Sequence, residues 1–437
     1  AETKPVELSE YQTFLIGLQG VGPVGGERYD GEDGVMRVIE QLEGVALPPS
    51  VWESSVLPAR VRDYRPAMLD GLLSSGEIVW VGSKTTGSKA KEPGLVALHP
   101  ADSLLLTVQD GEKNGEAPGE PVTLPDAVMA VLAPGGAYHA NQLAGLTRAA
   151  WDASSECVDE STGEILPHPW SDSQFEEALW SLVWQGKVTN SSFDPLRSLG
   201  ASSHAVKAPA RASRRRVRVR VSVPANMTGL WSAVPHADMQ EASAERVAIA
   251  RIEALLDRYG VIAPPMIDKE RLDGGFSGLY PVLRRMEEHG ALMRGMFVSG
   301  CGAAQFASRQ TVDALRACAA EPSAVVLDAT DPANLYGSVI AWPRTIGGFS
   351  IRPARRSGAS VVLRGGRLLA YAVPRSHHLL LAQDADPALQ QACNELAYAL
   401  QRNLRDGGIR GGVTFCDAND EPLTARGEWS RMLHVAG

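Results

Sequence analysis

One short phrase occurs three times along the chain: an apolar helix that stops at a glycine and turns directly into a strand. Each helix ends where a left-handed residue is favoured, and these positions hold Gly76, Gly186 and Gly290. A chain with such copies is a string of similar modules. The copies are MLDGLLSSGEIVWVG (Met68 to Gly82), ALWSLVWQGKVTN (Ala178 to Asn190) and LYPVLRRMEEHGALMRGMFV (Leu279 to Val298).

Another amphipathic helix precedes each copy, at Val35 to Leu42, Ala127 to Ala133 and Val247 to Gly260. The order helix, short link, helix, turn, helix, glycine, strand, loop, strand is that of a helix-turn-helix with a β-hairpin wing. We therefore predict an α+β protein of tandem winged-helix modules. Winged helices also serve as spacers and protein-docking units, so this shape alone does not establish DNA contact.

The length of 437 residues leaves room for several domains. After residue 321 the pattern changes to short β runs. Ala359 to Val373 predicts a hairpin that turns at Gly365 and Gly366, and Asp386 to Gly408 predicts a helix. We assign residues 1–33 to a linker and the end of a preceding module, 34–122 to a first winged helix, 123–222 to a second with a basic strand, 223–320 to a third, and 321–437 to a small β-barrel with a helix.

The composition is that of an ordinary soluble globular protein, with 44% hydrophobic and 21% charged residues. The cysteines never form a C-x-x-C pair, which favours a reduced, cytoplasmic protein. The sequence has neither an apolar run long enough to span a membrane nor a charged and apolar leader. Because it begins at Ala1 without a Met, we expect a piece excised from a longer protein.

A basic segment interrupts a chain whose net charge is −9. Eight Lys or Arg residues and no Asp or Glu lie between Arg197 and His236. The run RRRVRVRV has a period of two, so it predicts a strand with arginines on one face and valines on the other. Their spacing roughly matches the phosphates of a nucleic-acid strand; an edge strand protected from aggregation is the alternative. The predicted DNA-binding residues are Arg211, Arg214, Arg215, Arg216, Arg218 and Arg220.

Basic residues also mark the first and third modules. Lys84, Lys89 and Lys91 lie in a loop rich in Gly and Ser, where flexible ammonium groups reach phosphates. A solvated loop tip is the alternative interpretation. The third module adds Arg284 and Arg285 on its helix and Arg294 on the following strand, while the rings of Phe276 and Tyr280, four residues apart, are expected to be core.

Nucleotide and metal chemistry lack their sequence signatures. GVGPVG (Gly20 to Gly25) contains a proline and runs into a loop where a dinucleotide fold needs a helix, and GSKTTGSK (Gly82 to Lys89) places its lysine after the hydroxyl residue. His377 and His378 are adjacent and point to opposite faces of a strand, away from any cysteine or carboxylate cluster. We therefore predict no ATPase site, no metal and no cofactor in this chain.

The sequence DATDPANLYG, after the first strand of the C-terminal segment, groups two carboxylates with an amide. A DNA glycosylase needs a carboxylate to activate water or to stabilise an oxocarbenium-like sugar. Asp328, Asp331 and Asn334 are therefore the candidate catalytic residues. The rival interpretation is a turn around Pro332 that Asp331 and Asn334 cap.

Four phrases resemble the region that follows the motor in the large helicase-related (Lhr) superfamily-two DNA helicases of bacteria. They are YRPAMLDGLLSSGEIVWVG (Tyr64 to Gly82), LVWQGKVTNSSFDPLR (Leu182 to Arg197), GGFSGLYPVLRRMEEHGALMRGMFVSGCGAAQFAS (Gly274 to Ser308) and DATDPANLYGSVIAWP (Asp328 to Pro343). The resemblance implies tandem winged helices and a β-barrel, an ATP-dependent 3′–5′ motor elsewhere in the same polypeptide, and self-association as a homotetramer. It also implies a distant similarity to the AlkZ-type winged-helix DNA glycosylases.

Two functions follow from these observations. The first is a nucleic-acid-binding and oligomerisation region of a cytoplasmic, nucleoid-associated helicase in DNA repair, whose partner is single-stranded or damaged duplex DNA. The alternative is a DNA glycosylase that excises uracil or an alkylated base. The sequence lacks the Gln-x-Gln or Gln-x-Asp motif of that family, and Gln174-Phe175-Glu176 is its nearest triplet. Self-association is also expected if Trp180 and Trp184 form an apolar face that needs cover; a core role is the alternative.

Overall fold

The computed structural model describes residues 4–22, 28–84, 93–106, 123–154, 157–158, 165–166, 169–202, 224–235, 243–270, 272, 274–318, 324–373, 377–382 and 415–423. The chain divides into two compact units. Unit 1 comprises Ala1–Val45, Val51–Arg65 and Ser243–Gly437, and unit 2 comprises Ala46–Ser50 and Pro66–Ala242. In the described part of the chain, no helix combines the length and the apolar character that a membrane span requires.

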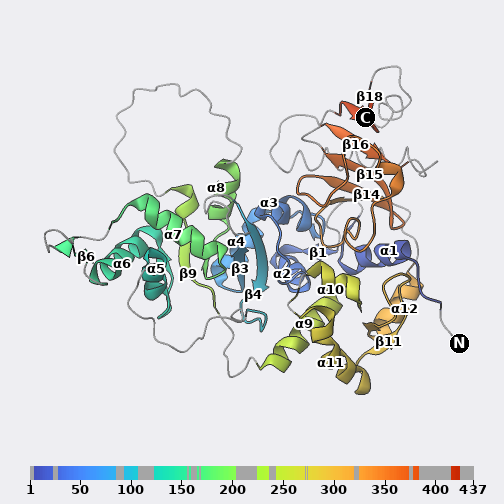
Figure 1. Ribbon diagram of the computed structural model, residues 1–437, viewed down its shortest axis with the longest axis horizontal. Helices are drawn as coiled ribbons and strands as arrows, with labels where there is room; N and C mark the ends of the chain where they lie inside the picture. Colours follow the sequence, from blue (N-terminus) through green and yellow to red (C-terminus); the bar gives the residue numbers. More distant parts are fainter. Residues whose placement is uncertain are drawn as a thin grey trace. The chain divides into compact units, whose positions relative to one another are not determined.

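The second module, in unit 2, has the complete winged-helix order (Figure 1). Its strands form an antiparallel sheet in the order β5-β9-β8. Thr123 and Asp126 cap the start of α5 reciprocally, each side chain accepting a hydrogen bond from the other residue's backbone amide. The elements are α5 (Leu124–Leu132), β5 (Tyr138–His139), α6 (Ala140–Ala153), α7 (Asp172–Trp184), β8 (Val188–Asn190) and β9 (Leu230–Ala233), with the short pair β6 (Cys157–Val158) and β7 (Ile165–Leu166) between α6 and α7.

Tryptophans form the core of this module. Trp180 and Trp184 on α7 are 0% and 6% exposed, and their stacked rings lie 5.5 Å apart between centroids. Trp231 on β9 meets Trp180 edge to face at 5.6 Å. The core interpretation of Trp180 and Trp184 is therefore confirmed, and these residues give no reason for a second copy to cover them.

The helices and strands of the first module follow the same winged-helix order as those of the second module. Leu47 takes the place of the first strand through a bridge to Val96, so that Leu47, β4 and β3 stand side by side. In unit 2, the Thr189 hydroxyl donates a hydrogen bond of 2.7 Å to the Trp80 carbonyl, which joins β3 to the second module. The elements are α2 (Gly31–Gln41), α3 (Pro49–Val51), the π-helical turn η1 (Trp52–Val56), α4 (Pro66–Ser75), β3 (Ile78–Ser83) and β4 (Leu95–Pro100), and β1 (Tyr29–Asp30) pairs in parallel with β2 (Val61–Arg62).

The third module lies in unit 1, and its sheet has the order β10-β12-β11. Helix α1 (Leu8–Leu18) adds Tyr11, Phe14 and Leu15 to the core of this module. The Tyr11 hydroxyl donates a hydrogen bond of 2.9 Å to the carbonyl of Tyr259. The elements are α9 (Ala244–Tyr259), β10 (Val261–Ile262), α10 (Pro264–Glu270), α11 (Gly275–Glu288), β11 (Met293–Gly295), β12 (Gln305–Ala307) and the following α12 (Arg309–Ala317).

The repeated glycines have the predicted conformation. Gly76, Gly186 and Gly290 have φ angles of 80°, 74° and 77°, in the left-handed region. All three sheets also share one order, in which the third strand lies between the first and the second. The protein is therefore a mixed α and β structure with winged-helix modules, as predicted.

The C-terminal segment forms a six-stranded sheet in the order β13-β14-β15-β16-β17-β18. Gly365 and Gly366, with φ of 52° and 71°, connect β14 to β15, which confirms the predicted hairpin. Among the described strands, β13 and β18 do not pair, so the predicted barrel is not confirmed. The helix expected from Asp386 to Gly408 lies outside the described residues. The strands are β13 (Val325–Asp328), β14 (Ser360–Arg364), β15 (Arg367–Val373), β16 (His378–Leu381), β17 (Asp417–Ala418) and β18 (Glu421–Pro422).

Candidate nucleic-acid interface

The wing of the first module is the turn between β3 and β4, at the end where Ser83 pairs with Leu95. Lys84 directly follows β3, and its Nζ lies 5.4 Å from the centroid of the Trp184 ring. The lysine therefore lies at the base of the wing, against an aromatic face of the second module. Lys89 and Lys91 lie in the same turn but outside the described residues.

The wing of the second module is the long connection between β8 and β9. Asn190 pairs with Trp231, so residues 191–229 leave the hairpin and return to it at the same end. Helix α8 (Asp194–Ser202) and the 3-10 turn η2 (Ala225–Met227) belong to this connection. The segment predicted to be a basic strand falls in this connection along the sequence. Outside the described residues are Arg211, Arg214, Arg215, Arg216, Arg218 and Arg220.

The arginines of the third module are each paired with an acid. Arg284 and Glu288, four residues apart on α11, lie 3.1 Å from each other, and Arg285 forms an ion pair with Glu245. Arg294 on β11 lies 3.4 Å from the Glu287 carboxylate. All three pairs are at the surface, where they contribute little to stability but partly neutralise the charge of these arginines.

The aromatic rings at the start of α11 are core, as the sequence analysis expects. Phe276 and Tyr280 lie 6.4 Å and 5.9 Å from Phe306, measured between ring centroids. Phe306 is fully buried on β12. Both side chains are partly buried, and these contacts pack them against the core of the third module.

The carboxylate and amide loop after β13 has the contacts of a turn. Asp331 is 0% exposed and accepts two hydrogen bonds from the guanidinium of Arg60, at 2.8 and 3.0 Å. Its Oδ1 also accepts the Ala333 amide at 2.8 Å, while Asn334 accepts the Tyr336 amide at 3.0 Å. These are the bonds of the rival, structural interpretation. Water has no access to the Asp331 carboxylate in this conformation.

Asp328 is bound in the same loop. Its carboxylate accepts hydrogen bonds from the backbone amides of Thr330 and Gly358, at 2.8 and 2.9 Å. Burial raises its pKa despite these bonds. In the described part of the chain, no group of three His, Cys, Asp or Glu residues has a geometry that could hold a metal ion.

Two basic residues hold the outside of the loop. Arg355 donates hydrogen bonds to the carbonyl oxygens of Asn334, at 2.6 Å, and Thr330, at 3.0 Å. Lys269 on α10 donates a bond of 2.8 Å to the carbonyl of Pro332. Burial, with a further contribution from the Arg355 charge, lowers the pKa of Lys269 to about 7. Neither Arg355 nor Lys269 lies in a recognisable motif, so no sequence signal predicts these contacts.

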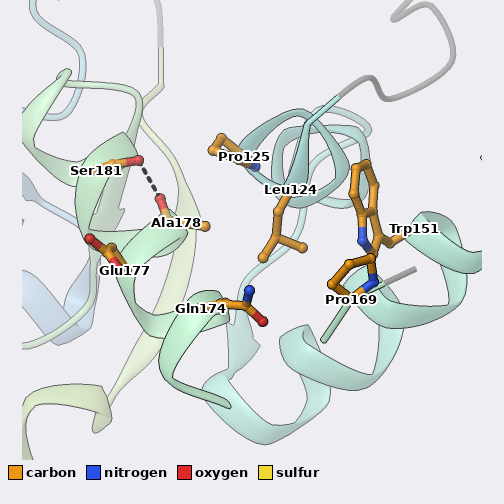
Figure 2. Close-up of a pocket in the computed structure, with 8 residues that line it drawn as sticks. All are labelled: Leu124, Pro125, Trp151, Pro169, Gln174, Glu177, Ala178 and Ser181. Carbon is orange, nitrogen blue, oxygen red and sulfur yellow. Dashed lines mark hydrogen bonds between the residues drawn. The ribbon is translucent and has the colours of Figure 1, made fainter. Parts of the chain in front are cut away.

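A groove opens in the second module, on the side of α7 shown in Figure 2. Its volume is about 380 Å³. One wall consists of apolar side chains from α5 and α6 together with Pro169. The other wall consists of four residues of α7. They are Leu124, Pro125, Trp151 and Pro169 on the first wall, and Gln174, Glu177, Ala178 and Ser181 on the second.

Comparison with known proteins identifies the modules. Two family models, each described as a large helicase-related protein winged-helix domain, match residues 6–101 and 241–326. The Lhr helicase/uracil glycosylase of Escherichia coli K12 is 38% identical over 455 residues, which cover 96% of this chain. The chain belongs to the large helicase-related (Lhr) family.

Further similarities support this assignment. The Lhr helicase and probable uracil glycosylase of Mycolicibacterium smegmatis is 37% identical over 410 residues, 90% of this chain. The Lhr region described here spans only 27% and 25% of the length of the two relatives. The DNA glycosylase AlkZ of Streptomyces sahachiroi has a similar fold, with a TM-score of 0.54, 14% identity and coverage of 95% of this chain and 100% of AlkZ.

Proposed function

We propose that this Lhr region binds DNA through the wings of its first two modules and holds it for an ATP-driven motor in the rest of the polypeptide. The supporting observation is where the predicted cations fall: one group lies between β3 and β4, and the other between β8 and β9. The described arginines of the third module are instead paired with glutamates. Contacts of wing cations with phosphates favour sequence-independent binding.

The test replaces Arg214, Arg216, Arg218 and Arg220 with Gln and measures duplex affinity by fluorescence anisotropy across a salt series. We expect the slope of log affinity against log salt to flatten by roughly three to four units if each arginine neutralises one phosphate. The matched control replaces Arg284, Arg285 and Arg294 with Gln, and should change the slope less. An unchanged slope in the first variant would assign the arginines to the edge-strand interpretation.

A second candidate function is excision of uracil from DNA, because both curated relatives are named as helicases and uracil glycosylases. Such an enzyme flips the base into a pocket and cleaves its bond to the sugar with an activated water. The test incubates the chain with an end-labelled duplex containing one uracil and then cleaves abasic sites with alkali. A duplex with thymine in that position is the control, and equal cleavage of both would reject this function.

The same experiment tests the candidate catalytic residues. If uracil is excised and Asp331→Asn remains folded with an unchanged rate, Asp331 has no catalytic role; the same comparison applies to Asp328 and Asn334. The burial of Asp331 against Arg60 supports a structural role for this carboxylate in the turn.

We further propose a homotetramer, a cytoplasmic and nucleoid-associated location, participation in DNA repair, and closure of the C-terminal sheet into a barrel by residues outside the described part. These proposals rest on the resemblance to Lhr proteins. Sedimentation of the purified chain tests the first of them, and an experimental structure that includes the residues outside the described part tests the last.

A further inference from the structure

The groove of the second module is built from one helix face and an apolar wall. Gln174, Glu177, Ala178 and Ser181 follow the spacing of a single face of α7. Opposite them, the Leu124 side chain points into the space and the Trp151 ring lies beside Pro169 (Figure 2). Proline and tryptophan present rigid apolar surfaces, which lose little conformational entropy when a ligand is bound.

The charge around the groove is negative. Helices α5, α6 and α7 carry five acidic residues, Asp126, Asp152, Asp172, Glu176 and Glu177, but a single basic one, Arg148. Arg148 is already engaged, because it lies 3.7 Å from Asp152 and 6.0 Å from the centroid of the Trp170 ring. Glu177 lines the groove and has no ion-pair partner among the described residues. This field repels phosphates and attracts cations.

We propose that this groove docks a peptide segment of a partner protein in which an apolar side chain stands next to a basic one. The apolar side chain would pack between Leu124 and Trp151, and the basic group would face the Glu177 carboxylate. We choose a basic peptide as the ligand because the five carboxylates repel nucleic acid and acidic peptides and attract basic groups. The second module would then bind DNA at its wing and a protein at α7.

The test uses the whole chain and two fluorescein-labelled six-residue peptides, one alternating leucine with arginine and the other alternating leucine with glutamate. Fluorescence anisotropy should detect binding of the first peptide only. Glu177→Lys and Trp151→Ala should each weaken that binding by about tenfold.

Matched controls separate the groove from general attraction of a basic peptide to an acidic protein. Glu77→Lys makes the same charge change at an exposed turn of unit 2, and Leu146→Ala removes an exposed apolar side chain from α6 without touching the groove. Both should leave peptide affinity within about twofold. Circular dichroism melting confirms the fold of each variant, and Trp151→Phe replaces Trp151→Ala if the latter unfolds.

Two results would overturn the proposal: equal binding of the two peptides, or equal losses in the groove and control variants. If the peptide binds the monomer but not the self-associated chain, a second copy of the chain covers the groove, and the groove is a contact between copies. DNA affinity is measured on the same variants, so a failure of the proposed DNA-binding function is distinguishable from a failure of the peptide site.

Discussion

Two opposite charges, those of Arg60 and Asp331, are completely removed from water in unit 1. Besides Asp331, the Arg60 guanidinium donates to the carbonyl of Val56 at 3.0 Å and to the Gln19 side chain at 2.9 Å. A buried pair adds little net stability when both charges are present, but the loss of one partner leaves the other charge uncompensated. Removal of the carboxylate should therefore cost far more than an average substitution in a loop.

We expect Asp331→Asn to lower the free energy of unfolding by about 3–5 kcal/mol, because the Arg60 guanidinium stays buried without a counter-charge. Urea unfolding followed by circular dichroism measures the change. Asp328→Asn is the control in the same loop, and should cost about 1–2 kcal/mol because it weakens only hydrogen bonds. Equal midpoints for Asp331→Asn and the unsubstituted chain would contradict the structural role.

Lys269 should make stability depend on pH. Its folded pKa of about 7 lies below the value of 10.5 in an unfolded chain, so between these values the unfolded state binds more protons. The contribution of Lys269 to stability therefore rises from pH 7 towards pH 10, with a slope of at most about 1.4 kcal/mol per pH unit. Lys269→Met should remove this rise, which urea unfolding at several pH values would detect. Parallel curves for both proteins would rule it out.

The loop shows how far the sequence determines this site. Asp331 and Asn334 cap a turn next to Pro332, and this could be predicted because the contacts are made within a few residues. The ion pair with Arg60 could not, because it joins residues 271 positions apart. Arg355 and Lys269 were missed for the same reason: their partners are backbone carbonyls, which have no sequence signature.

At the scale of elements, the helix-to-strand glycines are the most informative feature. The left-handed conformation at the end of each helix favours a residue without a Cβ, and this local preference is visible in the sequence. The pairing of β8 with β9 is not visible, because 39 residues separate Asn190 from Leu230 and hydrophobic periodicity says nothing about partners so distant. The sequence therefore assigned the basic segment to the second module but did not show that it lies between the two strands of a hairpin.

Two of these glycines should respond differently to alanine. Around Gly76 there is open space, so Gly76→Ala should cost only the strain of the left-handed backbone, about 1–2 kcal/mol. A Cβ at Gly186 would lie 3.2 Å from Val81, so Gly186→Ala should cost about 1 kcal/mol more, because Val81 must shift. Thermal unfolding compares them directly, since both lie in unit 2. If Gly76→Ala is the more harmful substitution, the packing argument is incorrect.

At the scale of the whole molecule, the net charge of −9 opposes both DNA binding and self-association. The large exposed apolar side chains of the described residues are Leu95 on β4, Leu146 on α6, Met293 on β11 and Met296 directly after β11. Stable apolar interfaces between subunits need much larger continuous surfaces. In a tetramer of this chain, as the Lhr resemblance implies, the described residues would therefore contribute polar contacts between subunits.

Such an interface makes a specific prediction about mass. At micromolar concentration and low salt, sedimentation equilibrium should give about four times the mass of 46.6 kDa. High salt should shift the distribution towards smaller species, because screening weakens polar and charged contacts but not apolar ones. The double variant Leu146→Asp and Met296→Asp is the control and should leave the mass unchanged at low salt. A single species of 46.6 kDa under all conditions would exclude self-association, and a salt-resistant tetramer that the double variant dissociates would show that the interface is apolar.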